Sequence, residues 1–364
     1  MSITILLALL RDVESIDVIC PKENQFTEEL ELPSKVKLRE FYKYDDSKSI
    51  LRLLKIPWGN YDTVIFNMLP TGFGNGSISN AIALFIPILL KKYFRKNNIR
   101  VVYHNSVFTN DVSMLGYNSA FDKVRSFFLG LVEKILFKNL DTFVLLDLYK
   151  ERIDKSIRKN KVRVLKFRYI ESVPTIYLNG KMTLECLNVE KASTPIVLMH
   201  GFWGPQKNFE LGLSALKYLK EQGSKFKLVI SGGINHHFPD YERKFNELLN
   251  SYSDIIDEYL GPVSEADIMN IFLNANLLLL PYNAPGGLSG VLEHAIFFEV
   301  PTVAIDFPEY REQAKGIGFV RLIDSNVNIK LNAKDLLMGP NRNSSIKIRE
   351  KIEKAVRNLQ ELIW

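Results

Sequence analysis

The stretch PYNAPGGLSGVLE, residues 281–293, decides the fold class of this chain. The very apolar run Leu277–Pro281 predicts a buried strand, and the residues from Gly290 through Phe298 predict a helix. The glycines therefore fall where a strand ends and a helix begins. Free N–H groups and the helix dipole at such a point favour a phosphate or diphosphate, and glycine lets the anion approach the backbone.

This glycine-rich loop supplies the first candidate binding residues. Glu293 falls in the first turn of the predicted helix, where a carboxylate can hydrogen-bond the hydroxyls of a ribose. The alternative is a tight turn with a surface glutamate, and we favour the phosphate site because ligands of open α/β sheets bind where strands end. The candidate residues are Gly286, Gly287, Ser289, Gly290, Val291 and Glu293.

A second loop, GFWGPQKN (201–208), has the same place in its own strand–helix unit. It follows the apolar run Pro195–His200 and precedes a helix that Asn208 is expected to cap and Gly223 to end. Lys207 would offer a point charge to the diphosphate from this neighbouring loop, with Gly204 as a further contact. The alternative is a solvated lysine before a helix.

Short apolar runs alternate with amphipathic stretches on both sides of these loops, which predicts parallel sheets covered on both faces. After Gly316 the regular alternation fades. The predicted strands are Ile16–Cys20, Lys35–Phe41, Thr63–Met68, Arg100–His104, Thr142–Leu146, Val162–Phe167, Pro195–His200, Lys227–Ser231, Glu258–Leu260, Leu277–Pro281 and Thr302–Ile305. Other predicted helices are Ile50–Leu54, Ile78–Tyr93, Phe121–Phe137, Tyr149–Ile157, Tyr241–Leu249 and one that a Ser264–Asp267 capping box starts and that runs through Leu273.

The architecture that fits this alternation is α/β, with two Rossmann-like, doubly wound domains facing across a cleft. A length of 364 residues suits two domains. We place them at residues 1–172 and 173–344. An amphipathic helix at 345–364 closes the chain and could pack back on the first domain. No parallel crossover fits between Ile3–Leu9 and Ile16–Cys20, so the first segment is a helix or part of a truncated unit.

The stretch from Val197 to Arg311 resembles the C-terminal domain of glycosyltransferase family four, a group of GT-B enzymes with glycogen-synthase-like and mannosyltransferase-like members. The resemblance implies an acceptor-side domain at 1–172 and a nucleotide-sugar-binding domain at 173–344. In that family the lysine matching Lys207 touches donor phosphates, and the glutamate matching Glu293 binds the ribose. The matching segments are PQKN (205–208), the strand Lys227–Gly233, LGPVSE (260–265), the run Leu277–Tyr282, GGLSGVLE (286–293) and VPTV (300–303).

Two positions depart from the family pattern. The family usually has an arginine five residues before the lysine, and this chain has Phe202. The family also usually carries a first glutamate, associated with the transferred sugar, where this chain has Pro285. Some relatives use a Ser-Gly-Val loop instead, and Ser289-Gly-Val291 is similar to theirs. The resemblance therefore supports binding of the nucleotide diphosphate more strongly than it supports binding of the transferred sugar.

The first half offers weaker candidates. The loop TGFGNG (71–76), with Gly74, follows a predicted strand but lacks the third glycine of a dinucleotide fingerprint, so it is a flexible loop or a phosphate contact. His104 and Asn105 end a predicted buried strand, where His104 would contact the donor sugar or the acceptor hydroxyl as the candidate catalytic residue. A core or capping histidine is the alternative. Asp147 is either a cleft contact or a helix cap.

Composition excludes several classes of protein. A hydrophobic fraction of 46% and a charged fraction of 24% exclude a disordered chain. Cys20 and Cys186 cannot build a disulfide framework, and the adjacent pair His236–His237 is a poor metal site, so we expect no metal, no cofactor and a reducing cytoplasm. No segment reads as a signal peptide or a membrane span. The net charge of +6 favours anionic partners. The sequence carries no nucleic-acid-binding signature, so we do not expect specific binding of nucleic acid.

Aromatic and basic residues interleave in two segments, Leu84–Arg100 and Lys123–Lys138. Two basic amphipathic helices could rest on an anionic membrane surface, at the inner face of the membrane. A lipid-linked acceptor would be available to a protein bound there. The alternative is a pair of core helices with solvated basic faces. The sequence does not indicate an oligomeric state.

Three functions remain open. The first is a glycosyltransferase, retaining by resemblance, that moves a sugar from a nucleotide-diphosphate donor onto a glycan or lipid-linked glycan. The chain has no D-x-D pair of the kind that holds a metal in GT-A enzymes, which favours metal-independent transfer. The second is a degenerate, non-catalytic protein that binds nucleotide-sugar or a partner. The third, a nucleotide-sugar epimerase, would need acidic groups that the chain around Pro285 does not offer.

Overall fold

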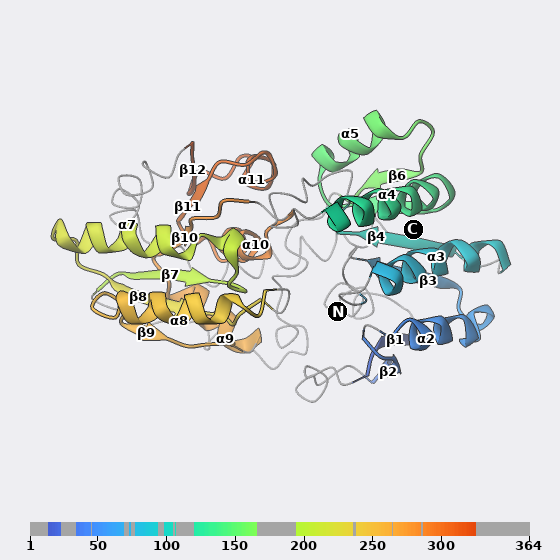
Figure 1. Cartoon of the computed structure of the whole chain (residues 1–364), viewed down its shortest axis with the longest axis horizontal. Coiled ribbons are helices and arrows are strands. Elements are labelled where there is room, and N and C mark those ends of the chain that lie inside the picture. The colour runs from blue at the N-terminus through green and yellow to red at the C-terminus, as the bar shows by residue number, and fades with distance from the viewer. Residues whose placement is uncertain are drawn as a thin grey trace. The chain divides into compact units, whose positions relative to one another are not determined.

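The computed structural model describes residues 14–22, 34–44, 46–68, 73, 77–93, 98–104, 106, 120–165, 194–235, 238–263, 265–284 and 287–324. These residues form two compact units (Figure 1), one made of the described residues up to 165 and one of those from 194 onward. Each unit is α/β with parallel strands, as the sequence predicts. The expected segments at Ile3–Leu9 and 345–364, the linker and Ser264 lie outside the described residues.

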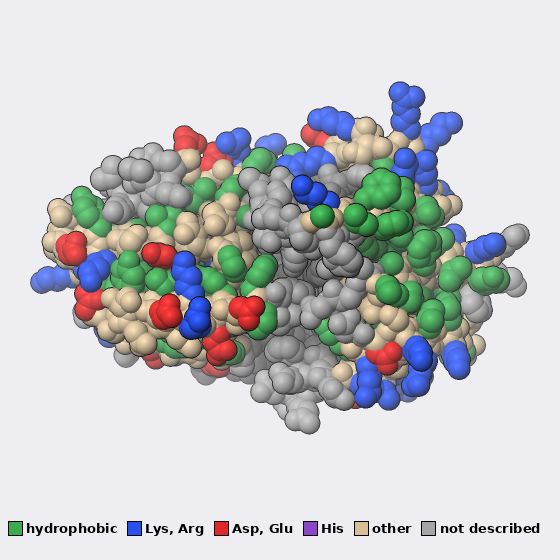
Figure 2. Space-filling view, in the orientation of Figure 1, with side chains coloured by type: hydrophobic (Ala, Val, Ile, Leu, Met, Phe, Trp, Pro, Cys, Tyr) green, Lys and Arg blue, Asp and Glu red, His purple; other side chains and the backbone are tan. Residues whose placement is uncertain are grey.

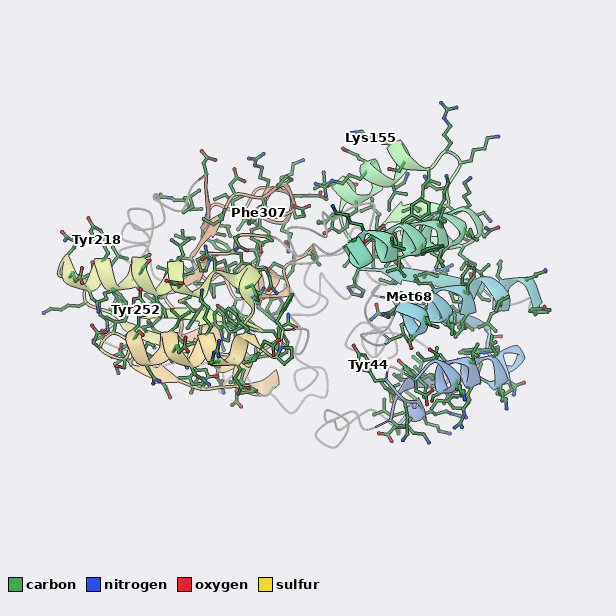
Figure 3. The ribbon with its side chains drawn as sticks, in the orientation of Figure 1. Tyr44, Met68, Lys155, Tyr218, Tyr252 and Phe307 are labelled. Carbon is green, nitrogen blue, oxygen red and sulfur yellow. The ribbon has the colours of Figure 1, made fainter. Side chains whose placement is uncertain are left out.

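The first unit contains two parallel sheets. Strands β1 (Ile16–Pro21) and β2 (Val36–Tyr42) form a pair, and β3 (Thr63–Met68), β4 (Asn98–Tyr103), β5 (Asp141–Val144) and β6 (Val162–Val164) form a second sheet in that order. The helices are α2 (Ser47–Leu51), α3 (Ser77–Tyr93), α4 (Ala120–Asn139) and α5 (Asp147–Ser156), with 3-10 turns at Arg52–Lys55 and Trp58–Asn60. Met68, labelled in Figure 3, is fully buried at the end of β3.

The second unit is one six-stranded parallel sheet in the order β12-β11-β10-β7-β8-β9. The strands are β7 (Ile196–His200), β8 (Lys227–Ser231), β9 (Glu258–Tyr259), β10 (Leu277–Leu280), β11 (Thr302–Ile305) and β12 (Val320–Ile323). The helices are α7 (Phe209–Glu221), α8 (Tyr241–Ser251), α9 (Glu265–Asn274), α10 (Gly290–Phe297) and α11 (Pro308–Gln313), and η4 (Pro205–Lys207) is a 3-10 turn.

The strand order reverses between β7 and β10. From β7 the chain moves outward to β8 and β9, and then returns to place β10 on the other side of β7. Four consecutive leucines form β10, and all are buried because the strand lies in the middle of the sheet. Ligands of such sheets bind at this reversal, outside the carboxyl ends of the strands. The loops that follow β7 and β10 are the two candidate loops.

Gly232 explains how the neighbouring loops approach one another. A Cβ atom at this position would lie 2.0 Å from the carbonyl oxygen of Gly201, and φ at Gly232 is +101°. Only glycine satisfies both the close contact and the left-handed backbone. The backbone segments after β7 and β8 therefore touch directly, and Gly201 N–H donates to Ser231 O at 3.2 Å.

Two expectations about the second unit were wrong. Asn208 precedes α7, but its backbone is left-handed (φ 45°) and its side chain makes no capping hydrogen bond, because side-chain capping needs an extended residue there. The alternation also does not fade directly after Gly316: α11 was not expected before this glycine, and β12 follows it and pairs with β11 from Thr302↔Val320 to Ile305↔Ile323. Both elements are short, and β12 carries Arg321, so neither has a clear periodic signal.

Candidate functional site

The structure brings the two candidate loops together at the reversal of strand order. Asn283, after β10, donates from its backbone N–H to Gln206 O at 3.1 Å and from Nδ2 to Pro205 O at 3.3 Å. A Cβ atom at Gly201 would lie 3.6 Å from Val291 Cγ2 and 3.4 Å from Tyr282 Oη. The turn that carries Lys207, the end of β10 and the start of α10 thus form one continuous surface.

Lys207 has an unusual environment for a lysine. Its Nζ lies 3.7 Å from the centroid of the Tyr282 ring, and no carboxylate among the described residues lies within ion-pair distance of it. Burial lowers the pKa of Lys207 to about 7. The Tyr282 ring favours the ammonium ion through a cation–π contact but does not neutralise it. A partly buried cation without a counter-ion suits an anionic ligand.

The start of α10 is capped by a side chain and follows a glycine turn. Ser289 is the N-cap, and its Oγ accepts a hydrogen bond from Leu292 N–H at 3.2 Å. Gly287 has φ +101°, a conformation that glycine adopts without strain. Gly290 and Val291 form the first turn behind this cap, and Gly286 lies outside the described residues. The arrangement combines a helix dipole with a tight glycine turn.

Glu293 is buried in the first turn of α10. Gln313 Nε2 donates to Glu293 Oε1 at 2.8 Å and to Ser289 O at 3.2 Å, while Gln313 Oε1 accepts from Ser289 N–H at 3.0 Å. Gln313 comes from α11, which begins after Phe307, labelled in Figure 3. No pattern in the sequence pointed to Gln313, because α11 itself was not expected. Tyr282 was missed too, although its place directly after a strand was a usable signal.

Two histidines lie beneath this surface and are structural. His200 Nδ1 is hydrogen-bonded to Ser231 Oγ at 2.7 Å, and burial lowers its pKa to about 3. Burial also lowers the pKa of His294 to about 4. Phe272 packs against both imidazoles, with ring centroids 5.4 Å from each. Both histidines are neutral near pH 7.

Of the candidates of the first unit, His104 directly follows β4 and Asp147 is the first residue of α5. His104 Nε2 donates to Asn67 Oδ1, so the imidazole is tied to the end of β3. The buried Glu133 of α4 accepts from Tyr103 Oη at 2.7 Å and from Ser106 Oγ at 2.6 Å, which holds the residues on both sides of His104. Asp147 is exposed in the first turn of α5.

Three further candidates are placed as follows. Gly204 is buried at the N-cap of η4, where a Cβ atom would meet Gln206 Oε1 at 2.7 Å. Gly74 and Asn105 lie outside the described residues. Within the described part of the chain, no group of three or more His, Cys, Asp or Glu side chains is placed to hold a metal ion.

Comparison with known proteins finds one matching family and several similar structures. Residues 187–336 match the family described as glycosyl transferases group 1, and no curated protein matches the chain. Sucrose-phosphate synthase from Thermosynechococcus elongatus is 16% identical, with a TM-score of 0.63, over 99% of this chain and 87% of that chain. HepE from Anabaena, solved with UDP and glucose, is 12% identical, with a TM-score of 0.60, over 99% of this chain and 90% of that chain.

A third structure has a different activity. UDP-GlcNAc 2-epimerase from Methanocaldococcus jannaschii is 14% identical, with a TM-score of 0.57, over 99% of this chain and 96% of that chain. At these identities the structures show the fold. The fold is that of GT-B proteins, with two Rossmann-like domains, as the resemblance implied. Residues 187–336 carry a glycosyl transferases group 1 domain, which confirms the predicted class of enzyme.

Proposed function

We propose that the protein transfers a sugar from a nucleotide-diphosphate-sugar donor to a glycan or lipid-linked glycan acceptor. The observation that carries the proposal is the cation at the reversal of strand order: Lys207 lies over Tyr282, with no counter-ion among the residues that the structure describes, beside the start of α10. A diphosphate would gain both the ammonium ion and the N-terminal dipole of α10. HepE from Anabaena has been solved with UDP and with UDP-glucose, which supports this class of donor.

Each donor-site residue has a role in this proposal. Lys207 and the backbone of residues 286–291 bind the diphosphate and stabilise the charge that develops on it as the sugar leaves, and Gly204 shapes the turn before Lys207. Glu293 binds the ribose. Retention of the anomeric configuration follows from the resemblance, and independence from metal follows from the lack of a D-x-D pair. Both belong to the same proposal.

The acceptor side of the proposal rests on the first unit. His104 is the proposed catalytic contact, because its imidazole is held by Asn67 at the carboxyl end of the sheet, where ligands of parallel sheets bind. Gly74, Asn105 and Asp147 are proposed as further contacts with the sugar or acceptor. The domain boundaries, 1–172 and 173–344, belong to the same proposal.

We also propose that α3 and α4 rest on an anionic membrane surface on the cytoplasmic side. An apolar stripe of α4 is exposed to solvent at helical spacing: Val124, Phe127, Phe128, Leu131 and Ile135. Figure 2 shows hydrophobic side chains gathered over α3 and α4. The exposed lysines Lys123, Lys134 and Lys138 lie on the same helix, which suits anionic head groups. No helix among the described residues is long and apolar enough to cross a membrane.

A panel of nucleotide-sugars tests the function. We expect one donor to stabilise the protein thermally and to release nucleotide when a suitable acceptor is present. Lys207→Ala should weaken nucleoside diphosphate binding far more than nucleoside binding, because the lysine acts on the phosphates. Lys217→Ala is the matched control: it removes the same charge from α7, where Lys217 pairs with Asp254. Equal losses for both ligands would exclude a phosphate role for Lys207.

The alternatives give different results in the same experiment. Phe202 is 64% exposed where relatives have an arginine, and this favours the degenerate binding protein as the second candidate. That protein would be stabilised by a nucleotide-sugar without turnover on any acceptor. An epimerase would convert one nucleotide-sugar into another without an acceptor.

A further inference from the structure

Gln313 joins the two parts of the proposed donor site. It is 1% exposed, and its carboxamide makes three hydrogen bonds, all of them to the cap and first turn of α10. Nε2 donates to the Glu293 carboxylate and to the Ser289 carbonyl, and Oε1 accepts from the Ser289 N–H. A single side chain thus uses both of its polar atoms on the residue that caps the helix and on the proposed ribose ligand.

We infer that Gln313 is a positioning residue that fixes the Glu293 carboxylate and the Ser289 turn as one unit. The inference rests on the proposed function, because it concerns how the donor site is held. A carboxylate that binds a ribose must keep its rotamer before the ligand arrives, or part of the binding free energy is lost in ordering it. Gln313 orders it from behind, and the same amide holds the backbone that would face the diphosphate.

The amide is chemically suited to this place. Its Nε2 group carries two hydrogens and its Oε1 atom accepts. The site uses both: two hydrogen bonds are donated by Nε2 and one is accepted by Oε1. A carboxylate at the same position could accept from the Ser289 N–H but would face the Glu293 carboxylate and the Ser289 carbonyl with like charge. A hydrocarbon would leave the buried Ser289 N–H without that acceptor.

Two variants and one control test the inference. Gln313→Leu keeps the bulk and removes the three hydrogen bonds, and we expect donor affinity to fall about tenfold or more. Thr302→Val is the control, because it removes a buried hydrogen bond from Thr302 Oγ1 to Val300 O in β11, away from the loop. It should lower stability while leaving donor affinity within about twofold. A double-mutant cycle with Glu293→Ala should show that the two losses are not additive.

Gln313→Glu distinguishes positioning from simple packing by a pH profile. We expect its affinity relative to wild type to be low at pH 8 and to recover toward pH 6, because a protonated carboxyl can donate to Glu293. Dividing the affinity of the variant by that of wild type at each pH removes the effect of the titration of Lys207, which both proteins share. A ratio that does not change with pH, or a Gln313→Leu variant that binds as well as wild type, would overturn the inference and leave the proposed function standing.

Hydrogen exchange separates this inference from the proposed function. In the unliganded protein, Gln313→Leu should speed exchange in the 287–293 segment, and Thr302→Val should not. If wild type binds no nucleotide-sugar, the proposed function fails, and exchange at 287–293 still decides whether Gln313 holds the turn. Unchanged exchange in Gln313→Leu would overturn the positioning role by itself.

Discussion

The proposed anion site contains a lysine whose charge depends on pH in the physiological range. Burial lowers the pKa of Lys207 to about 7, so at pH 8 most of the free protein carries a neutral amine there. A bound diphosphate favours the ammonium form and raises this pKa. Donor binding at pH 8 should therefore take up close to one proton, and affinity should fall by up to about tenfold per pH unit above 7.

Calorimetry checks this prediction. The measured binding enthalpy at pH 8 should differ between two buffers of different ionisation enthalpy, because the buffer supplies the proton. A nucleotide-sugar is the right ligand, since its diesterified phosphates do not titrate in this range. Lys207→Met should abolish the difference, whereas equal enthalpies in both buffers for wild type would contradict the lowered pKa.

The buried histidines predict that acid destabilises the second unit. The pKa of His294 is lowered to about 4 and that of His200 to about 3, from 6.5. Below pH 6.5 the unfolded chain binds protons that the folded chain does not, so the free energy of unfolding falls as pH drops toward 4. Above pH 6.5 these groups contribute no pH dependence. His294 alone accounts for a loss on the order of 2–3 kcal/mol.

Native-state hydrogen exchange in β10 measures this loss. The free energy of unfolding obtained from the Leu277–Leu280 amides should decrease between pH 6.5 and pH 4. His294→Phe should have a shallower slope, because phenylalanine packs beside Phe272 without titrating. The same slope in both proteins would show that other groups cause the acid sensitivity.

At the scale of elements, the junction between the ends of β7 and β8 depends on Gly232. Gly232→Ala would place a Cβ 2.0 Å from the Gly201 carbonyl oxygen in a backbone with φ +101°. Gly223→Ala is the matched control, because φ is +81° there and no atom lies within 4 Å of the added Cβ. The control should lower stability by about 1 kcal/mol from backbone strain, and Gly232→Ala by about 1–3 kcal/mol more. Similar unfolding midpoints for the two variants would contradict this account.

The elements also show what the sequence can and cannot predict. The apolar runs at β7, β8, β10 and β11 and the glycine turn before α10 were predictable, because buried parallel strands are continuously apolar and helix starts have local signals. The left-handed backbone of Asn208, the short strand β12 and the helix α11 were not. Gln313 acts through contacts with residues 20 and 24 positions away, and no local pattern records such contacts.

At the scale of the whole molecule, the two units divide the proposed tasks. The donor-site residues Lys207, Ser289 and Glu293 belong to the second unit, and the exposed stripe on α4 belongs to the first. Changes on α4 should therefore alter membrane binding while donor binding persists. The exposed Phe127 and Phe128, at 64% and 60%, would enter the interface between head groups and acyl chains.

Vesicle binding tests this division of tasks. Wild type should bind vesicles of anionic lipid at low salt and be released at high salt, because salt screens the attraction of surface lysines. Replacing Lys123 and Lys134 with Gln should weaken binding by about 1 kcal/mol for each lysine. The control, Lys225→Gln with Lys227→Gln, removes the same charge from exposed positions of the second unit and should bind as wild type.

Phe127→Ser with Phe128→Ser should also weaken binding, at high salt as well as at low salt, since burial of apolar surface is not screened. If wild type ignores anionic vesicles at low salt, α3 and α4 are ordinary covering helices, and a soluble glycan becomes the expected acceptor.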